Sequence, residues 1–144
     1  SEYLENHREG YYQRLKAISA DGDWNGWLVF FLQAIAIQAT QNSERVTAIQ
    51  ALYEEMKLAI QAATRSQYTV HVLDAIFNKP IFRSSDLAQQ LFREFGIHEK
   101  TGQGLLRQMR DTGILRELRP GSGRRPSTLC FPRLINLAEG RTVI

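Results

Sequence analysis

The chain has 144 residues, of which 43% are hydrophobic and 23% are charged, and this balance excludes a wholly disordered protein. Its formal net charge of +3 is unevenly divided: residues 1–65 carry six Lys or Arg and eight Asp or Glu, a net −2, whereas residues 66–144 carry twelve against seven, a net +5. The single cysteine, Cys130, excludes an internal disulfide and a cysteine metal cage. It favours a reducing location, and we expect the cytoplasm.

The first 65 residues predict a helical segment. From Glu2 to Ala20 the apolar and aromatic residues recur at three- and four-residue spacing, which is typical of a helix with one buried stripe. The stretch SADGDWNGW then breaks this pattern, and Asp21 or Asp23 can cap a second helix. That helix is predicted to continue to about residue 63, with a bend near Asn42–Ser43.

The front half of this second helix is apolar nearly all round. Trp24–Ala39 is the best candidate for a membrane segment, but Asn25, Gln33 and Gln38 interrupt it, and a spanning helix needs about 20 largely apolar residues. We therefore expect a buried helix and no membrane partner. Two or three helices cannot enclose so much aromatic surface, so this half is expected to pack against a partner.

Beyond Arg65 the pattern changes to shorter elements, which form a second predicted domain, residues 66–144. Three amphipathic helices are predicted, the second capped by Ser84 or Ser85 and closed by Gly96, and the third closed by Gly113. The tripeptide PIF is expected as a short edge strand between the first two helices. Two strands, Ile114–Leu118 and Thr128–Phe131, then flank an arginine-rich tip, and the segment RLINLAEG closes the chain as a short helix.

Three helices followed by a β-hairpin follow the order of a winged helix-turn-helix, in which the third helix enters the major groove and the hairpin, or wing, contacts the flanking backbone. On that third helix, Ile97, Gly102, Leu106 and Met109 are predicted to face the core. The cationic and amide side chains fall on the opposite face and suit phosphates and base edges. With the tip LRPGSGRRPST, the candidate DNA-binding residues are Lys100, Gln103, Arg107, Arg110, Arg119, Arg124 and Arg125.

Two features of the third helix weigh against strong DNA recognition. Gly102 and Gly104 each cost a helix interior about 1 kcal/mol relative to alanine. His98 stands where Ser, Thr, Asp or Asn would make a better cap. Because winged helices also dock proteins, a protein-interaction or dimerisation module without DNA binding remains an alternative.

Signals for an enzyme are poor in these residues. The three histidines, His7, His71 and His98, lie on unrelated predicted elements, and the sequence has no metal-ligand spacing and no glycine-rich phosphate loop. We therefore predict no catalytic, cofactor-binding or metal-binding residue in this chain.

Read in order, these segments resemble the C-terminal portion of bacterial Fic family proteins. SEYLENHREGYYQRLKAIS is similar to the helix that follows the Fic active-site motif, and DGDWNGWLVFFLQAIAIQA is similar to the helix that packs onto the Fic core. The long helix and the segment ending GILRELRPGSGRRPSTLCFPRLINLAEG are similar to the usual C-terminal extension. The Fic motif itself, His-Pro-Phe-x-x-Gly-Asn-Gly-Arg, is absent.

The resemblance implies that residues 1–65 end a Fic-type helical fold and flank a Fic core, and that residues 66–144 form a winged helix. It implies a parent enzyme that uses ATP and Mg²⁺ to transfer AMP to a hydroxyl of a target protein. This chain would then be a non-catalytic regulatory segment that binds double-stranded DNA or a partner protein and holds no cofactor. The alternatives are an interaction module, including a homodimer, and a standalone transcriptional regulator whose long helix is a dimer arm.

Overall fold

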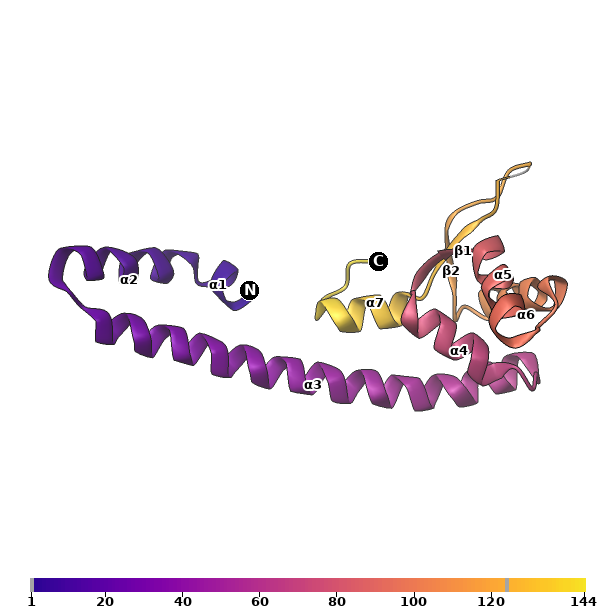
Figure 1. The fold of residues 1–144 in the computed structure, drawn as a ribbon, viewed down its shortest axis with the longest axis horizontal. Coiled ribbons are helices and arrows are strands. Elements are labelled where there is room, and N and C mark those ends of the chain that lie inside the picture. The colour runs from indigo at the N-terminus through magenta and orange to yellow at the C-terminus, as the bar shows by residue number, and fades with distance from the viewer. Residues whose placement is uncertain (1, 124) are drawn as a thin grey trace. The chain divides into compact units, whose positions relative to one another are not determined.

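The computed structural model describes residues 2–123 and 125–144. Over these residues the chain forms seven helices and one three-stranded antiparallel sheet (Figure 1), so the predicted mainly helical architecture is confirmed. The chain divides into two compact units, the first ending at Thr47 and the second comprising Ala48–Ile144. This division falls earlier in the chain than the predicted boundary at residue 65.

The first unit contains α1 (Glu2–Asn6), α2 (Arg8–Asp21) and the front part of α3 (Trp24–Thr64). The single helix predicted over residues 2–20 is therefore divided at His7, whose Nδ1 lies 2.9 Å from the carbonyl oxygen of Tyr3. Helix α3 continues through Asn42–Ser43 without interruption.

The turn between α2 and α3 follows from two small residues. Gly22 closes α2 with a left-handed φ of 68°, a conformation that glycine adopts without a Cβ clash. Asp23 caps α3, because its Oδ1 accepts a hydrogen bond from the backbone N–H of Gly26 at 2.9 Å. The prediction that an aspartate caps this helix is confirmed for Asp23.

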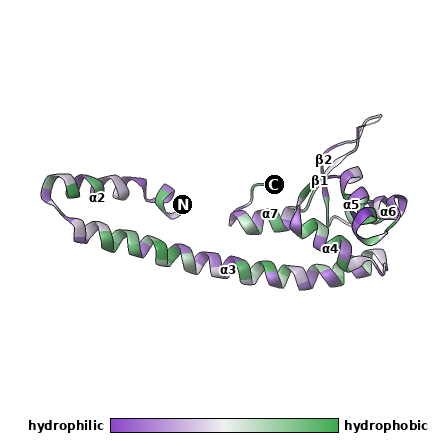
Figure 2. Cartoon of the chain, viewed as in Figure 1, coloured by the Kyte–Doolittle hydropathy of each residue, from purple (hydrophilic) through white to green (hydrophobic). Residues whose placement is uncertain are grey.

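The first unit is held together by aromatic contacts and encloses little of its apolar surface. Trp27 packs edge-on against Tyr11, with ring centroids 5.3 Å apart. Among the described residues of this unit, Ala34 is the one side chain that is fully buried, whereas Trp24 and Leu32 are each 62% exposed. Hydrophobic residues therefore line the front half of α3 (Figure 2) without being covered by the other helices of the first unit.

The second unit has a continuous core to which every one of its helices contributes. The second half of α3 supplies Leu52, Met56 and Ile60. The further helices are α4 (Thr69–Asn78), α5 (Ser84–Phe95), α6 (Glu99–Asp111) and α7 (Pro132–Glu139). The most fully buried residues include Leu73, Ile76, Ala88, Leu91, Ile97, Leu106, Met109 and Phe131.

The sheet of the second unit consists of β1 (Ile81–Arg83), β2 (Arg116–Arg119) and β3 (Thr128–Cys130), with β3 in the centre. Both outer strands pair antiparallel with β3, and Cys130 is opposite Ile81 on one side and Arg116 on the other. The edge strand predicted from PIF is thus confirmed. The strand predicted from Ile114 begins at Arg116 instead, because the N–H of Leu115 donates to the carbonyl of Met109 and continues the end of α6.

Besides the part-buried bond from the Thr69 hydroxyl to Gln61, two contacts of exposed side chains join α3 to elements of the second unit. The Tyr53 hydroxyl donates to Asp74 Oδ1 of α4 at 2.6 Å. Arg133 of α7 donates to both carboxylate oxygens of Glu55, at 2.6 and 2.7 Å, and this guanidinium holds the pKa of the Glu55 carboxyl below its usual value. Because these atoms are largely exposed, the pairs orient the helices more than they stabilise them.

We predict that Leu52→Ala lowers the free energy of unfolding of the second unit by about 2–5 kcal/mol. Leu52 is 5% exposed and belongs to the core, whereas Leu58 on the same helix is 74% exposed, so Leu58→Ala should change stability by less than about 0.5 kcal/mol. Urea denaturation followed by circular dichroism measures both. Equal effects of the two substitutions would show that the second half of α3 is not part of this core.

The contact between Tyr53 and Asp74 generates a pH prediction. The hydrogen bond to Asp74 is the largest of the effects that raise the pKa of Tyr53 to about 12. The folded-state pKa lies above the unfolded value of about 10. The stabilisation that the Tyr53–Asp74 hydrogen bond provides is therefore complete below pH about 10 and is lost as pH rises toward about 12. A pH titration followed by tyrosinate absorbance should show one tyrosine that ionises at a higher pH than the others. In Asp74→Asn the pKa of this tyrosine should fall back toward about 10. An unchanged titration in Asp74→Asn would refute the contact.

Candidate nucleic-acid interface

Helix α6 is amphipathic, and its two faces follow from the spacing of its residues. Gly102, Leu105, Leu106 and Met109 are buried and pack α6 against the core, chiefly against α5. Lys100, Gln103 and Arg107 are exposed. The predicted core residues of α6, and Ile97 just before it, are buried as expected, and three of the candidate side chains lie on solvent-facing positions of one helix.

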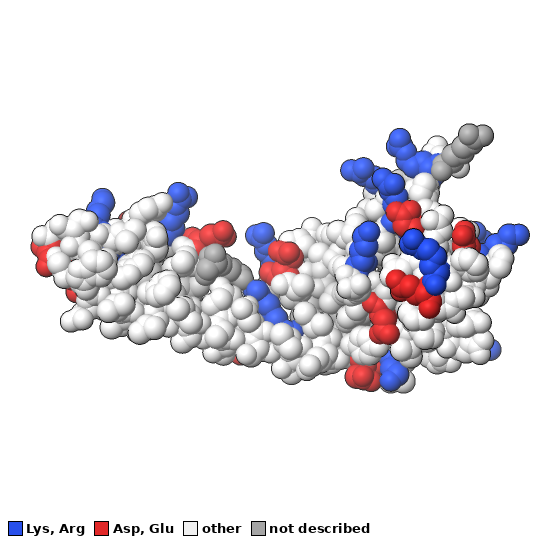
Figure 3. All heavy atoms as spheres, viewed as in Figure 1, with Lys and Arg blue, Asp and Glu red and all other residues white. Residues whose placement is uncertain are grey.

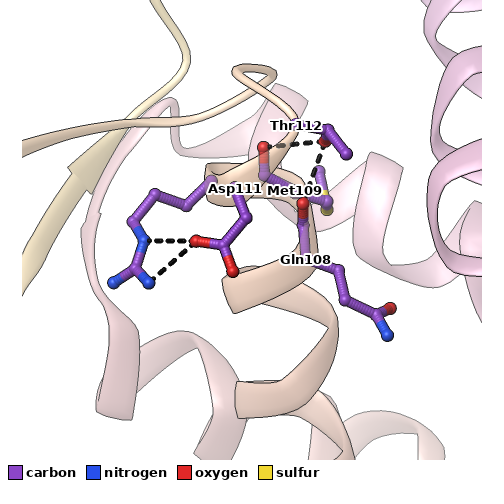
Figure 4. Close-up of polar contacts among 5 residues, drawn as sticks. Gln108, Met109, Asp111 and Thr112 are labelled. Atoms are coloured by element: carbon purple, nitrogen blue, oxygen red, sulfur yellow. Dashed lines mark hydrogen bonds and ion pairs between the residues drawn. The ribbon is translucent and has the colours of Figure 1, made fainter.

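Both ends of α6 are closed by side chains. The His98 ring accepts the backbone N–H of Lys100 through Nδ1 at 3.3 Å, so histidine does serve as the N-terminal cap. At the other end the Thr112 hydroxyl lies between the carbonyl oxygens of Gln108 and Met109, at 2.9 and 3.2 Å (Figure 4). The helix therefore has a defined length of Glu99–Asp111 despite its two glycines.

Arg110 differs from the other candidate cations. Its Nε and Nη2 both donate to Asp111 Oδ1, at 3.1 and 2.9 Å, and its side chain is partly buried. Part of its charge is therefore already neutralised. By contrast, within residues 2–123 and 125–144 no ion pair is formed by Lys100 or Arg107.

The hairpin between β2 and β3 carries exposed arginines close to its tip. Arg119 and Arg125 are both exposed, and the backbones of Ser122 and Arg125 exchange two hydrogen bonds of 3.0 and 2.9 Å. A Cβ at Gly121 would lie 3.1 Å from the carbonyl oxygen of Arg125, so a larger residue there would require the hairpin backbone to shift by a few tenths of an ångström. Arg124, the remaining candidate at the tip, lies outside the described residues.

The charge of this surface is mixed rather than uniformly positive. Figure 3 shows cationic side chains gathered on the hairpin, with acidic side chains near its base. Glu117 is exposed on the same strand as Arg116 and Arg119. Neither of these arginines, nor Arg125, forms an ion pair in the part of the chain that the structure describes, so their charges are available to an anionic partner.

A small cavity lies where α5, α6 and β3 meet, and we call it the notch. It has a volume of about 140 Å³ and is lined by Ser84, Gln103, Leu106, Arg107, Arg110, Ser127 and Leu129. The backbone N–H of Ser84 donates to the carbonyl of Ser127 at 3.0 Å, and the Ser127 hydroxyl donates to the Ser84 hydroxyl at 3.2 Å. The notch brings three of the candidate residues together with two serines that the sequence did not single out as ligands.

The expectation that Ser84 or Ser85 caps α5 is wrong. Arg83 occupies the N-cap position of α5 and makes no side-chain cap, and Ser84 is the first helical residue. The N–H of Ser84 is satisfied instead by Ser127, which is distant in sequence. The Ser85 hydroxyl donates to Asp86. Only the sheet pairing that places Ser127 next to α5 could have indicated this arrangement.

No known protein-family model matches the chain. None of the helices in residues 2–123 and 125–144 has the length and apolarity needed to cross a membrane. The same residues contain no group of three His, Cys, Asp or Glu side chains that could share a metal ion.

The two glycines of α6 should respond differently to substitution. A Cβ at Gly104 would meet no atom within 4 Å, whereas a Cβ at Gly102 would lie 3.4 Å from the Cα of Ala88 on α5. We predict that Gly104→Ala stabilises the second unit by about 0.5–1 kcal/mol, since alanine restricts the unfolded chain and favours the helix. Gly102→Ala should gain less than Gly104→Ala, because its methyl group would lie against α5 at the short end of ordinary van der Waals contact. Thermal unfolding of both variants measures this, and a larger gain at Gly102 would contradict the packing of α6 on α5.

Proposed function

We propose that residues of the second unit form a winged helix-turn-helix that binds double-stranded DNA. The order α4, β1, α5, α6, β2, β3 supports this fold, since a short strand precedes the second helix and a hairpin follows the third. In this arrangement α6 is the recognition helix and the hairpin between β2 and β3 is the wing.

The observation that carries the proposal is the exposed, unpaired state of the cations on α6 and on the hairpin. Lys100, Gln103 and Arg107 lie on exposed positions of one helix, and Arg119 and Arg125 are exposed on the hairpin. In the described residues none of these four cations is held by a carboxylate. DNA binding requires such donors, because phosphates are contacted by Lys and Arg and base edges by Arg, Lys and Gln.

Within this proposal the candidate residues have different roles. Gln103 is suited to a base edge, since glutamine can bind adenine through two hydrogen bonds, and Arg107 is suited to a phosphate beside the groove. Arg119 and Arg125 are suited to phosphates on either side of the groove. Arg110 contributes less, because Asp111 already accepts two of its hydrogen bonds.

We infer further that the first unit serves as a docking part of a larger protein, in line with its resemblance to Fic family proteins. The supporting observation is the exposure of Trp24, Leu32 and Ile35, each at least half exposed, on the front half of α3. In a Fic-type parent, ATP and Mg²⁺ would be handled by residues outside these 144 positions. Cellular location in the cytoplasm is part of the same proposal.

The alternative function is a protein-interaction or dimerisation module, and the same exposed apolar residues of α3 favour it. The two functions differ in the residues on which binding depends. Binding of a protein partner to the first unit should be lost when Trp24 and Leu32 are substituted and retained when Arg119 and Arg125 are substituted. Duplex binding should instead be lost with the two arginines and retained without Trp24 and Leu32.

DNA binding predicts a definite salt dependence. If about five phosphates are neutralised, the logarithm of the association constant should fall against the logarithm of salt concentration with a slope of about −4 to −5. Fluorescence anisotropy of a labelled duplex at several salt concentrations measures the slope. Absence of binding even at low salt would reject the proposal.

Single substitutions distinguish the roles of the cations. Arg107→Gln should cost about 1–3 kcal/mol of binding free energy, and Arg110→Gln should cost less because of its bond to Asp111. Arg125→Gln should weaken binding to all duplexes alike and reduce the salt slope by about 1. Arg93→Gln, which removes an exposed charge from the last turn of α5, is the matched control. Equal losses in Arg93→Gln and Arg107→Gln would indicate that only the net charge matters.

A further inference from the structure

The chemistry of the notch points to an anion. The described residues that line it provide two guanidinium groups, one amide and two hydroxyls, and none of them is a carboxylate. Such donors match the oxygens of a phosphate, which accept hydrogen bonds and carry negative charge. Leu106 and Leu129 form the apolar part of the lining and are buried.

The volume of the notch limits what can occupy it. About 140 Å³ is well above the about 10–15 Å³ needed for one water molecule. It is below the about 300–1,000 Å³ that is usual for small-molecule and cofactor sites. The volume therefore matches a single tetrahedral oxyanion better than a whole nucleotide.

The two arginines of the notch are not equivalent. Arg110 is engaged by Asp111, so its charge is partly compensated before any ligand binds. Arg107 is exposed and forms no ion pair within the described residues. Arg107 is consequently the main charged donor, and Arg110 is a secondary one.

Helix α5 adds a weaker electrostatic contribution at the same place. Ser84, its first residue, lines the notch, and the start of a helix carries about half a positive charge. Arg83 at the N-cap position offers no side-chain acceptor to the first turn. Asp86 lies in that turn but is not part of the notch lining.

We propose that the notch holds one phosphodiester oxyanion of the DNA backbone, bound chiefly by Arg107 and by the hydroxyls of Ser84 and Ser127. To donate to the oxyanion, the Ser127 hydroxyl turns its one proton away from Ser84. This inference rests on the proposed DNA-binding function and deepens it. Gln103 and Arg107 belong both to the notch and to the exposed face of α6. A phosphate seated here fixes the position of α6 along the duplex, since backbone contacts set the register in which side chains meet the bases.

The proposal is tested first with inorganic phosphate on the whole chain. Phosphate replaces chloride at constant ionic strength while NMR follows the backbone amides of Ser84 and Ser127 and the side-chain Nε of Arg107. We expect shifts at these positions that saturate, that are lost in Arg107→Gln and that persist in Arg93→Gln. No shift at the notch, or unsaturated shifts spread over all exposed arginines, indicates an adventitious ion only and overturns the proposal.

A second measurement identifies the source of the phosphate. Ser127→Ala should weaken duplex binding by about threefold to tenfold, the effect of one lost hydrogen bond, whereas Ser85→Ala, whose hydroxyl is not in the notch, should leave it unchanged. Urea denaturation of Ser127→Ala controls for folding. If the folded variant binds duplex as tightly as the unsubstituted chain, the notch proposal fails while the DNA-binding function stands. Saturable phosphate binding without any duplex binding rejects the DNA function and the DNA origin of the oxyanion together.

Discussion

The candidate interface depends on the pairing of β3 with strands on both of its edges. Cys130 lies opposite Ile81 on one side and Arg116 on the other, and the fully buried Phe131 that follows donates its N–H to the carbonyl of Pro80. This pairing joins the segment before α5 to the segment after α6. Without it, Ser127 would not lie beside Ser84, and the notch and the hairpin would have no defined position relative to α6.

Charge compensation, rather than the number of cations, decides which residues of this surface are available to an anion. Arg107 and Arg110 lie on the same helix, and the sequence alone gave no reason to assign them different roles. In the folded chain Asp111 accepts two hydrogen bonds from Arg110, while Arg107 remains exposed. Compensation of this kind is local and short in range, since exposed charges are screened over about 8–10 Å. A mixed surface can therefore still present individual cations with their full charge.

Helix α3 shows how one regular element can lie in two environments. Its second half contributes Leu52, Met56 and Ile60 to the core of the second unit, and its polar contacts are made to α4 and α7. Its front half leaves Trp24 and Leu32 largely exposed in a unit with one fully buried side chain among its described residues. The helix thus contributes to the core of the second unit at one end and carries exposed apolar side chains at the other.

Local patterns in the sequence were sufficient to predict most of the helices and strands. Apolar spacing placed the helices of the second unit and the buried stripe of α6, because side chains three and four residues apart share a helix face. Gly96 ends α5 with a left-handed φ of 67°, and Asp23 caps α3, and both follow from short-range backbone chemistry.

The sequence alone determined that the chain is mainly helical, that its second half is basic, and that exposed donors recur along α6. Contacts between distant segments decided the rest. The partner of the Ser84 N–H is Ser127 rather than a cap within the helix, and the core of the second unit includes part of α3 that the sequence assigned to the front segment. The spacing of apolar residues along the chain indicates only which face of a helix or strand a residue occupies. Which segment packs on that face, and which carboxylate reaches an arginine, depends on the three-dimensional path of the backbone.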